Sequence, residues 1–216
     1  KEASDAIQSL ANRMSGFNRI QDSAQRGLTV TVGKLTALGV AADTSTEITN
    51  MLTKSMGVGA EDVSGSLQRI AMMGESIGAG PAEIMRDYQE AMPYLVQFGS
   101  RAEEVFRGMK ATSEATGISM GTLMSISKKT DTFEGAAKQA GMLNAALGAN
   151  MVNAMDLMMT TDPVGRFEML RDAILDTGLT FDDMTYYQRI FYTEAAGLSD
   201  VSELSLVMSG NMDKLS

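Results

Sequence analysis

Two serine motifs come closest to the spelling of catalytic machinery. Gly117-Ile-Ser-Met-Gly121 has the spacing of a nucleophile elbow, in which the serine needs a general base and a preceding strand. The chain contains no His to act as that base, and the flanking residues have helical periodicity. A glycine that ends one helix and a serine, Ser119, that caps the next explain the same residues. We therefore interpret this motif as structural.

The second motif, Ser125-Ile-Ser-Lys128, has the spacing in which a neutral lysine can take a proton from serine. Lys128 is followed by Lys129 near an expected helix end, where two cations favour the last carbonyls and water. The supporting Lys-Thr-Gly triplet is absent, because the chain continues Thr130-Asp131. Gly33-Lys34 is not a phosphate loop either, since Leu35 stands where the magnesium-binding hydroxyl belongs.

Two pairs of carboxylates and one aromatic cluster complete the candidates. A carboxylate-based enzyme would need paired acids such as Asp182-Asp183 or Glu103-Glu104, but no other motif places a substrate beside them. The aromatic residues at helical spacing are expected to lie in the core, although a binding platform for a sugar or a partner is the alternative. This cluster consists of Tyr186, Tyr187, Phe191 and Tyr192.

Composition excludes several classes of function. With no His and no Cys among 216 residues, the chain has no catalytic triad, disulfide or Cys- or His-ligated metal. The formal net charge is −9, from 18 basic and 27 acidic residues, and disfavours binding to phosphate backbones. We therefore predict no catalytic, cofactor-binding or metal-binding residue, no cofactor, no enzymatic activity and no specific nucleic-acid partner.

We expect an all-α fold of about ten short helices joined by Gly-centred turns. This fold determines the positions of all these residues. Apolar residues recur at three- and four-residue steps, as in Met184, Tyr187 and Phe191. Leu28-Thr-Val-Thr-Val32 alternates like a strand, and we expect irregular structure, helix or intermolecular pairing there. The expected helices are 3–26, 44–56, 61–77, 81–98, 101–116, 119–129, 132–147, 151–159, 163–177, 181–196 and 200–209.

A Gly followed by an apolar residue marks most of the expected helix ends. The glycine is predicted to adopt a left-handed conformation, and the apolar residue to pack back on the finished helix. The next polar side chain should cap the following helix. These turns are at Gly39, Gly57, Gly78, Gly117, Gly178 and Gly197, and the predicted caps are Thr44, Ser119, Thr180 and Ser199. Their spacing is uneven, which predicts no fixed structural repeat.

Charge divides the chain unevenly. Residues 1–150 carry 14 basic and 16 acidic groups, whereas residues 151–216 carry 4 and 11. We predict an N-terminal helix with an irregular connector (1–43), a helical array (44–150) and an acidic C-terminal subdomain (151–216). The acidic part is expected to be an ordinary solvated surface, with repulsion from a negatively charged neighbour or docking to a basic one as the alternatives. No apolar run is long enough to span a membrane.

The second half of the chain contains three motifs in a fixed order. An aliphatic helix with Leu143-Asn-Ala145 is followed by Asp162-Pro-Val-Gly-Arg166 and then by Ala195-Ala-Gly-Leu198 before a capped helix. This order resembles a segment of the tail tape measure proteins, or related internal tail proteins, of tailed bacteriophages, and the resemblance covers about residues 100–211. Its motifs are made of caps and apolar positions rather than reactive groups.

The resemblance implies a virion protein in the tail tube or at its tip, in a longer parent chain that sets tail length and leaves ahead of the DNA. It implies tail tube and baseplate or hub proteins as partners, symmetric copies of the chain, and transient membrane contact during ejection. Some tail proteins cleave cell walls, and Glu75-Ser76 matches the first element of the lytic transglycosylase pattern. The second element is absent here, so Glu75 is assigned no catalytic role. The alternative function is a helical-repeat adaptor that binds a protein or peptide.

Overall fold

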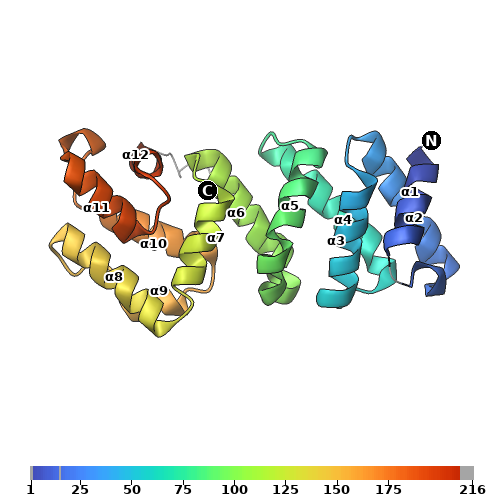
Figure 1. Cartoon of the computed structure of the whole chain (residues 1–216), viewed down its shortest axis with the longest axis horizontal. Helices are drawn as coiled ribbons and strands as arrows, with labels where there is room; N and C mark the ends of the chain where they lie inside the picture. The colour runs from blue at the N-terminus through green and yellow to red at the C-terminus, as the bar shows by residue number, and fades with distance from the viewer. Residues whose placement is uncertain (1, 15, 210–216) are drawn as a thin grey trace. The chain divides into compact units, whose positions relative to one another are not determined.

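The structure is a computed structural model that describes residues 2–14 and 16–209 (Figure 1). Over these residues it contains twelve α-helices, four 3-10 helices and no strand, which confirms the predicted all-α fold. The α-helices are α1 (Glu2–Arg13), α2 (Asp22–Ala37), α3 (Ala42–Ser55), α4 (Ala60–Met72), α5 (Pro81–Leu95), α6 (Ala102–Thr116), α7 (Met120–Lys129), α8 (Phe133–Leu147), α9 (Ala154–Met159), α10 (Pro163–Leu175), α11 (Tyr186–Ala196) and α12 (Val201–Ser209). The 3-10 helices are η1 (Phe17–Arg19), η2 (Met73–Ser76), η3 (Val96–Arg101) and η4 (Phe181–Asp183).

The chain forms two structural units that divide between Phe106 and Arg107, inside α6. The three parts expected from the sequence do not coincide with these units. The change in charge near Asn150 falls within the second unit, where α8 and α9 on either side of it pack against each other. A change in surface charge therefore does not mark a change in packing in this chain.

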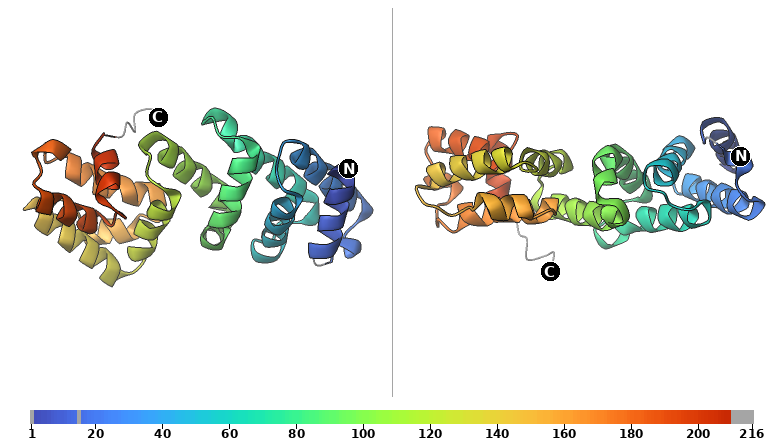
Figure 2. Two further views of the ribbon diagram at one scale, coloured as in Figure 1. Left: turned by 45° about the horizontal axis from the view of Figure 1, so that its top comes forward. Right: turned by 90° about the horizontal axis from the view of Figure 1, so that it is seen from below.

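The first unit is a two-layer stack of helices. α1, α3 and α5 lie in one layer and α2 and α4 in the other, as the view from below shows (Figure 2). α1, α2 and α3 each pack on the next helix in the chain and on the next but one, and α4 packs on α5. The buried positions of α2 follow one stripe, which includes Leu28, Thr31, Val32 and Leu35. The β-branched run is thus helical, because its branched side chains fill the space between the layers.

The stack repeats at an interval of about 40 residues, which the spacing of the glycines did not predict. α1, α3 and α5 begin at residues 2, 42 and 81, and α2, α4 and α6 begin at residues 22, 60 and 102. Hydrogen bonds join equivalent helices of successive pairs: Ser9 and Thr46 share a bond of 2.9 Å, and Gln68 donates to Thr31 at 3.3 Å. The prediction of no fixed period is therefore wrong for this unit.

The second unit packs around a core from helices α7 to α12. α7 contacts α10, α8 contacts both α9 and α11, and α12 contacts α10 and α11. Leu123, Leu143, Phe167 and Leu204 are among its almost fully buried side chains. Here the helices do not follow the alternating order of the first unit, so one chain combines two modes of helix packing.

A buried arginine holds three helices of the second unit together. The Arg166 side chain is 3% exposed and donates to the carbonyls of Ser127, Met158 and Thr160, and to the Asp131 carboxylate. These partners lie at or beyond the ends of α7 and α9, whereas Arg166 lies on α10. The guanidinium thus donates to backbone carbonyls at the ends of two other helices, where free carbonyls remain, and the Ser127 carbonyl also accepts from Thr130.

The predicted turns are confirmed at all six glycines, whose φ angles lie between 68° and 90°. Ser119 and Thr180 cap helices as expected, with Thr180 and Asp183 forming a capping box around η4. The caps predicted at Thr44 and Ser199 are wrong. Thr44 lies inside α3, and the Asp200 carboxylate, not Ser199, accepts from the Glu203 N–H in the first turn of α12.

The single helix expected over residues 3–26 is also wrong. α1 ends at Arg13, Gly16 has a φ of 83°, and η1 follows before α2 begins at Asp22. The break has a physical reason, since it lets Phe17 turn inward, where it is 7% exposed, and accept a 2.8 Å bond from Gln25 at its carbonyl. The helix expected over 181–196 is similarly divided, because Thr185 starts α11 with a second capping box.

Replacement of Gly197 by Ala should lower the free energy of unfolding by about 1–2 kcal/mol, because an L-residue is strained in the left-handed region. The φ of Gly197 is 74°, and an added Cβ would lie 3.3 Å from the Gln139 amide nitrogen. Gly141→Ala is the matched control, since Gly141 lies in α8 and a Cβ there meets nothing within 4 Å. Chemical denaturation should show that Gly141→Ala raises stability by up to about 1 kcal/mol. Equal effects at both positions would contradict the explanation.

Arg166→Leu should destabilise the second unit by about 3 kcal/mol, because it removes the guanidinium donor from the Met158 and Thr160 carbonyls and leaves Asp131 without its partner. Arg107→Leu provides the control, since Arg107 is exposed on α6 and should change stability by at most about 0.5 kcal/mol. Urea unfolding followed by circular dichroism measures both. A wild-type midpoint for the Arg166 variant would show that the guanidinium network contributes nothing to stability.

Candidate functional site

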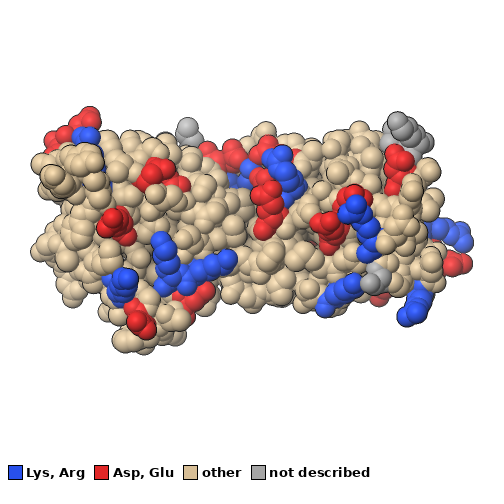
Figure 3. Space-filling view, in the orientation of Figure 1, with Lys and Arg blue, Asp and Glu red and all other residues tan. Residues whose placement is uncertain are grey.

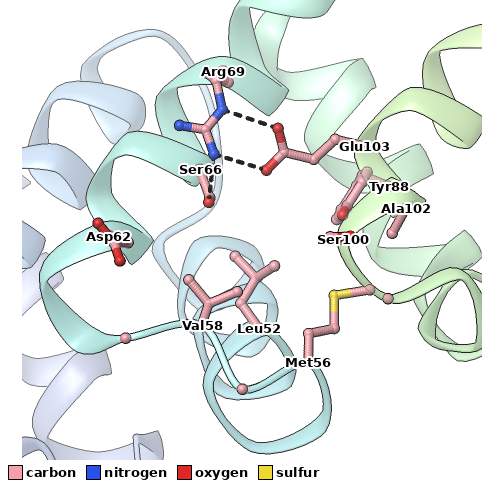
Figure 4. Close-up of a pocket in the computed structure, with 13 residues that line it drawn as sticks. Leu52, Met56, Val58, Asp62, Ser66, Arg69, Tyr88, Ser100, Ala102 and Glu103 are labelled. Atoms are coloured by element: carbon pink, nitrogen blue, oxygen red, sulfur yellow. Dashed lines mark hydrogen bonds and ion pairs between the residues drawn. The ribbon is translucent and has the colours of Figure 1, made fainter.

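The candidate site is a hollow of about 360 Å³ within the first unit (Figure 4). α3 and the turn after it form one side, α4 the second, and the beginning of α6 with the preceding turn the third. The lining is half apolar and half polar. It comprises Leu52, Met56, Gly57, Val58, Gly59, Asp62, Ser66, Arg69, Tyr88, Gly99, Ser100, Ala102 and Glu103.

An ion pair spans the hollow between α4 and α6. The Arg69 guanidinium donates two hydrogen bonds to the Glu103 carboxylate, at 3.0 and 3.1 Å, and a third to the Ser66 hydroxyl at 2.9 Å. The hydrogen bond to Glu103 raises the pKa of Arg69 above its ordinary value. Both charges are therefore already neutralised within the protein, and this pair joins equivalent helices of successive pairs, as the other bonds of the stack do.

The hydroxyl of Tyr88 is buried and has no hydrogen-bond partner. The side chain is 0% exposed and lies edge-on to Phe106, with 4.8 Å between the ring centroids. Burial, and secondarily the charge of Glu103, raises the pKa of Tyr88, so the phenol stays protonated. A protonated phenol without an acceptor is a latent donor at the wall of the hollow, not a base or a nucleophile.

The residues of the two serine motifs do not assemble into a site. The Ser119 hydroxyl accepts from the Thr122 N–H at 3.0 Å, as expected of a helix cap. Ser125 and Lys128 lie on α7, with Lys128 exposed in its last turn. Gly33 and Lys34 lie inside α2, so no phosphate loop exists there.

The acidic candidate residues do not form a catalytic pair either, because some are held by hydrogen bonds and the others lie apart. Hydrogen bonds from the side chain and backbone of Thr180 lower the pKa of Asp183, which keeps this carboxylate ionised. Glu103 is held by Arg69, and Glu75 is exposed on η2. Over residues 2–14 and 16–209, no three acidic side chains gather closely enough to hold a metal ion.

The aromatic cluster is not the core that the sequence predicts. Tyr192 is 3% exposed, but Tyr186, Tyr187 and Phe191 are 71%, 80% and 42% exposed. The periodicity of α11 is real, yet two aromatic rings occupy its solvent face. Besides the hollow, this group of exposed aromatic side chains is the second unusual feature of the chain.

Sequence reasoning missed the hollow, the orphaned Tyr88 hydroxyl and the buried Arg166. The partners involved are separated by 34 residues for Arg69 and Glu103 and by 39 for Arg166 and Ser127. No local motif joins such positions. The repeat of about 40 residues, read from helix starts rather than from glycines, is the signal that could have placed Arg69 opposite Glu103.

Comparison with known proteins returned no relative: no family model, no curated protein and no solved structure matches the chain. None of the described helices is both long and apolar enough to cross a membrane. Function is therefore inferred from the helix packing within each unit, from the hollow, from the exposed aromatic face and from the sequence motifs.

Tyr88→Phe should raise the free energy of unfolding by about 1 kcal/mol, because it removes a buried hydroxyl that has no partner. Tyr192→Phe is the control, since Tyr192 is buried but its hydroxyl is not an orphaned buried atom. Thermal unfolding should show a higher midpoint for the Tyr88 variant alone. A lower midpoint would mean that the Tyr88 hydroxyl makes a stabilising contact.

Proposed function

We propose that the chain is a structural and interaction protein of a phage tail, belonging to a tape measure protein or a related internal tail protein. The observation that carries this proposal is that the polar motif residues of the resemblance hold turns and helix ends in the second unit. The side chain of Asn144 bridges the turn after α8, accepting from the N–H groups of Met151 and Val152 at 2.9 and 2.8 Å. Such residues specify a particular packing and leave no reactive group.

The other two motifs act in the same way. Asp162 caps α10, Pro163 occupies its first turn, and Arg166 joins α10 to the ends of α7 and α9. Gly197 ends α11 in the left-handed conformation, and Leu198 after it is 8% exposed. The three motifs therefore lie in one folded unit, and each has a structural role there, as the proposal expects of a non-catalytic tail protein.

In this role the parent chain occupies the tail tube or tip, sets tail length and is released ahead of the DNA. Its partners are tail tube and baseplate or hub proteins, and symmetric copies of it surround the tail axis. The acidic balance favours passage beside DNA without binding to it. The chain works by contact and has no catalytic step.

The alternative function is a helical-repeat adaptor that binds a protein or peptide. One observation favours it: the first unit stacks helix pairs at intervals of about 40 residues, an arrangement typical of repeat proteins that present extended surfaces. Both functions are non-catalytic and depend on protein contacts. They differ in where the chain is found.

Purified particles of the phage that encodes the chain should contain it in the tail, and particles that have ejected their DNA should have lost it. Mass spectrometry of full and emptied particles, with cryo-electron microscopy of the tail, measures both. The tail tube protein is the control, because it should remain after ejection. Recovery of the chain only outside particles, bound to another protein, would favour the adaptor and overturn the tail assignment.

A further inference from the structure

α11 presents an aromatic face to solvent. Tyr187 and Phe191 lie four residues apart on one side of the helix, and Tyr186 lies beside them. The rings of Tyr186 and Tyr187 meet edge to face with 5.4 Å between centroids, yet both side chains are more than two thirds exposed. Paired tyrosines rarely remain in water without a use, because they offer large contact area at a low cost in side-chain entropy.

The backbone under these rings is fixed. Thr185 and Gln188 form a reciprocal capping box, with the Thr185 N–H donating to the Gln188 side chain at 2.8 Å. At the other end, Gln139 of α8 donates to the carbonyl of Ala195. The aromatic face is therefore a preorganised surface rather than a mobile one.

Exposed carboxylates precede and follow the rings in the chain. Asp182 and Asp183 precede α11 and Glu194 lies near its end, and all three are exposed. One oxygen of Asp183 accepts from the Thr180 N–H and hydroxyl, which leaves its other oxygen for a partner. Acidic side chains are visible at the upper left of Figure 3, over the turn that leads into α11. In the part of the chain that the structure describes, no ion pair joins any of these three to a basic side chain.

The three arginines on α10 and α11 are committed elsewhere, whereas Lys138 is exposed on the neighbouring α8. Arg166 is buried in its own network, and Arg171 donates to the Val207 carbonyl and pairs with Asp172. Arg189 lies over the Phe181 ring, 4.2 Å from its centroid. This last contact shows the chemistry that the neighbouring rings could repeat, a guanidinium stacked on an aromatic face.

We propose that the α11 aromatic face, Tyr186, Tyr187 and Phe191 with Asp182, Asp183 and Glu194, binds an arginine-bearing segment of a partner protein. Guanidinium groups stack on the tyrosine rings and pair with these carboxylates, while apolar stems cover Phe191. The inference extends the proposed function, on which it rests for the partner being a protein. The same negative charge repels DNA and anionic membranes.

Calorimetric titration of the whole chain with decaarginine and with decalysine peptides tests the proposal, because it measures the affinity for each peptide. The wild-type chain should prefer decaarginine. Tyr186→Ser and Tyr187→Ser should each weaken its binding by about two- to fivefold, and the double variant should lose the preference for arginine over lysine. Asp182→Asn should weaken binding of both peptides.

Two matched variants separate this face from general surface effects. Phe133→Ser removes an aromatic side chain that is 60% exposed at the opposite end of the neighbouring, antiparallel α8. Glu61→Gln removes an exposed carboxylate from the first unit. Neither should change binding, and circular dichroism should show that every variant remains folded. Equal affinity of the wild-type chain for the two peptides, or equal loss in the control variants, would overturn the proposal.

A photo-reactive amino acid at position 187 tests the partner in assembled particles. It should cross-link to an arginine-bearing segment of another tail protein, and a cross-link to an acidic segment would contradict the proposed chemistry. The two proposals fail in different ways. Absence of the chain from particles would remove the tail assignment and leave the peptide result standing, whereas loss of the arginine preference would remove this inference from a chain still located in the tail.

Discussion

The apolar stripes of the helices in the first unit are buried against more than one neighbour. α1, α2 and α3 each pack on the next helix in the chain and on the next but one, and this double use generates two layers. Polar contacts, such as Ser9 with Thr46 and Arg69 with Glu103, also join equivalent helices of successive pairs. The register of the layers is thus held at both apolar and polar positions.

The same requirement explains why the turns matter more than the helices' own propensities. A helix that must meet two neighbours has to reverse direction within a few residues, and the left-handed glycines provide that reversal. At Gly39, the following Val40 N–H donates to the Leu35 carbonyl at 2.9 Å, and the Val40 side chain is 2% exposed. The turn therefore satisfies a helix-end carbonyl and adds to the core in one step.

Local chemistry made these turns predictable from sequence, whereas the contacts between distant residues were not. Gly117 with Ser119, and Gly197 with Leu198, carry their signal within a few residues, so helix ends over most of the chain could be placed. The break at Gly16 escaped because the apolar pattern continues across it. The Arg69–Glu103 pair in the hollow and the Arg166 bonds to α7 and Asp131 join residues 34 or more positions apart. The exposure of Tyr187 depends on which elements leave α11 uncovered. The periodicity of the sequence predicts neither the contacts between distant residues nor the exposure of Tyr187.

The hollow and the aromatic face differ in what they leave available to a partner. In the hollow, Arg69 and Glu103 have already satisfied each other, and the Tyr88 hydroxyl is covered by its surroundings. On α11, the rings of Tyr186 and Tyr187 and the carboxylates before and after them in the chain remain in water. Binding energy comes from groups that exchange water for a partner, so the exposed face retains more of it than the hollow does. Arg69, Glu103 and Arg166 are therefore committed to the fold, whereas the aromatic rings of α11 remain exposed.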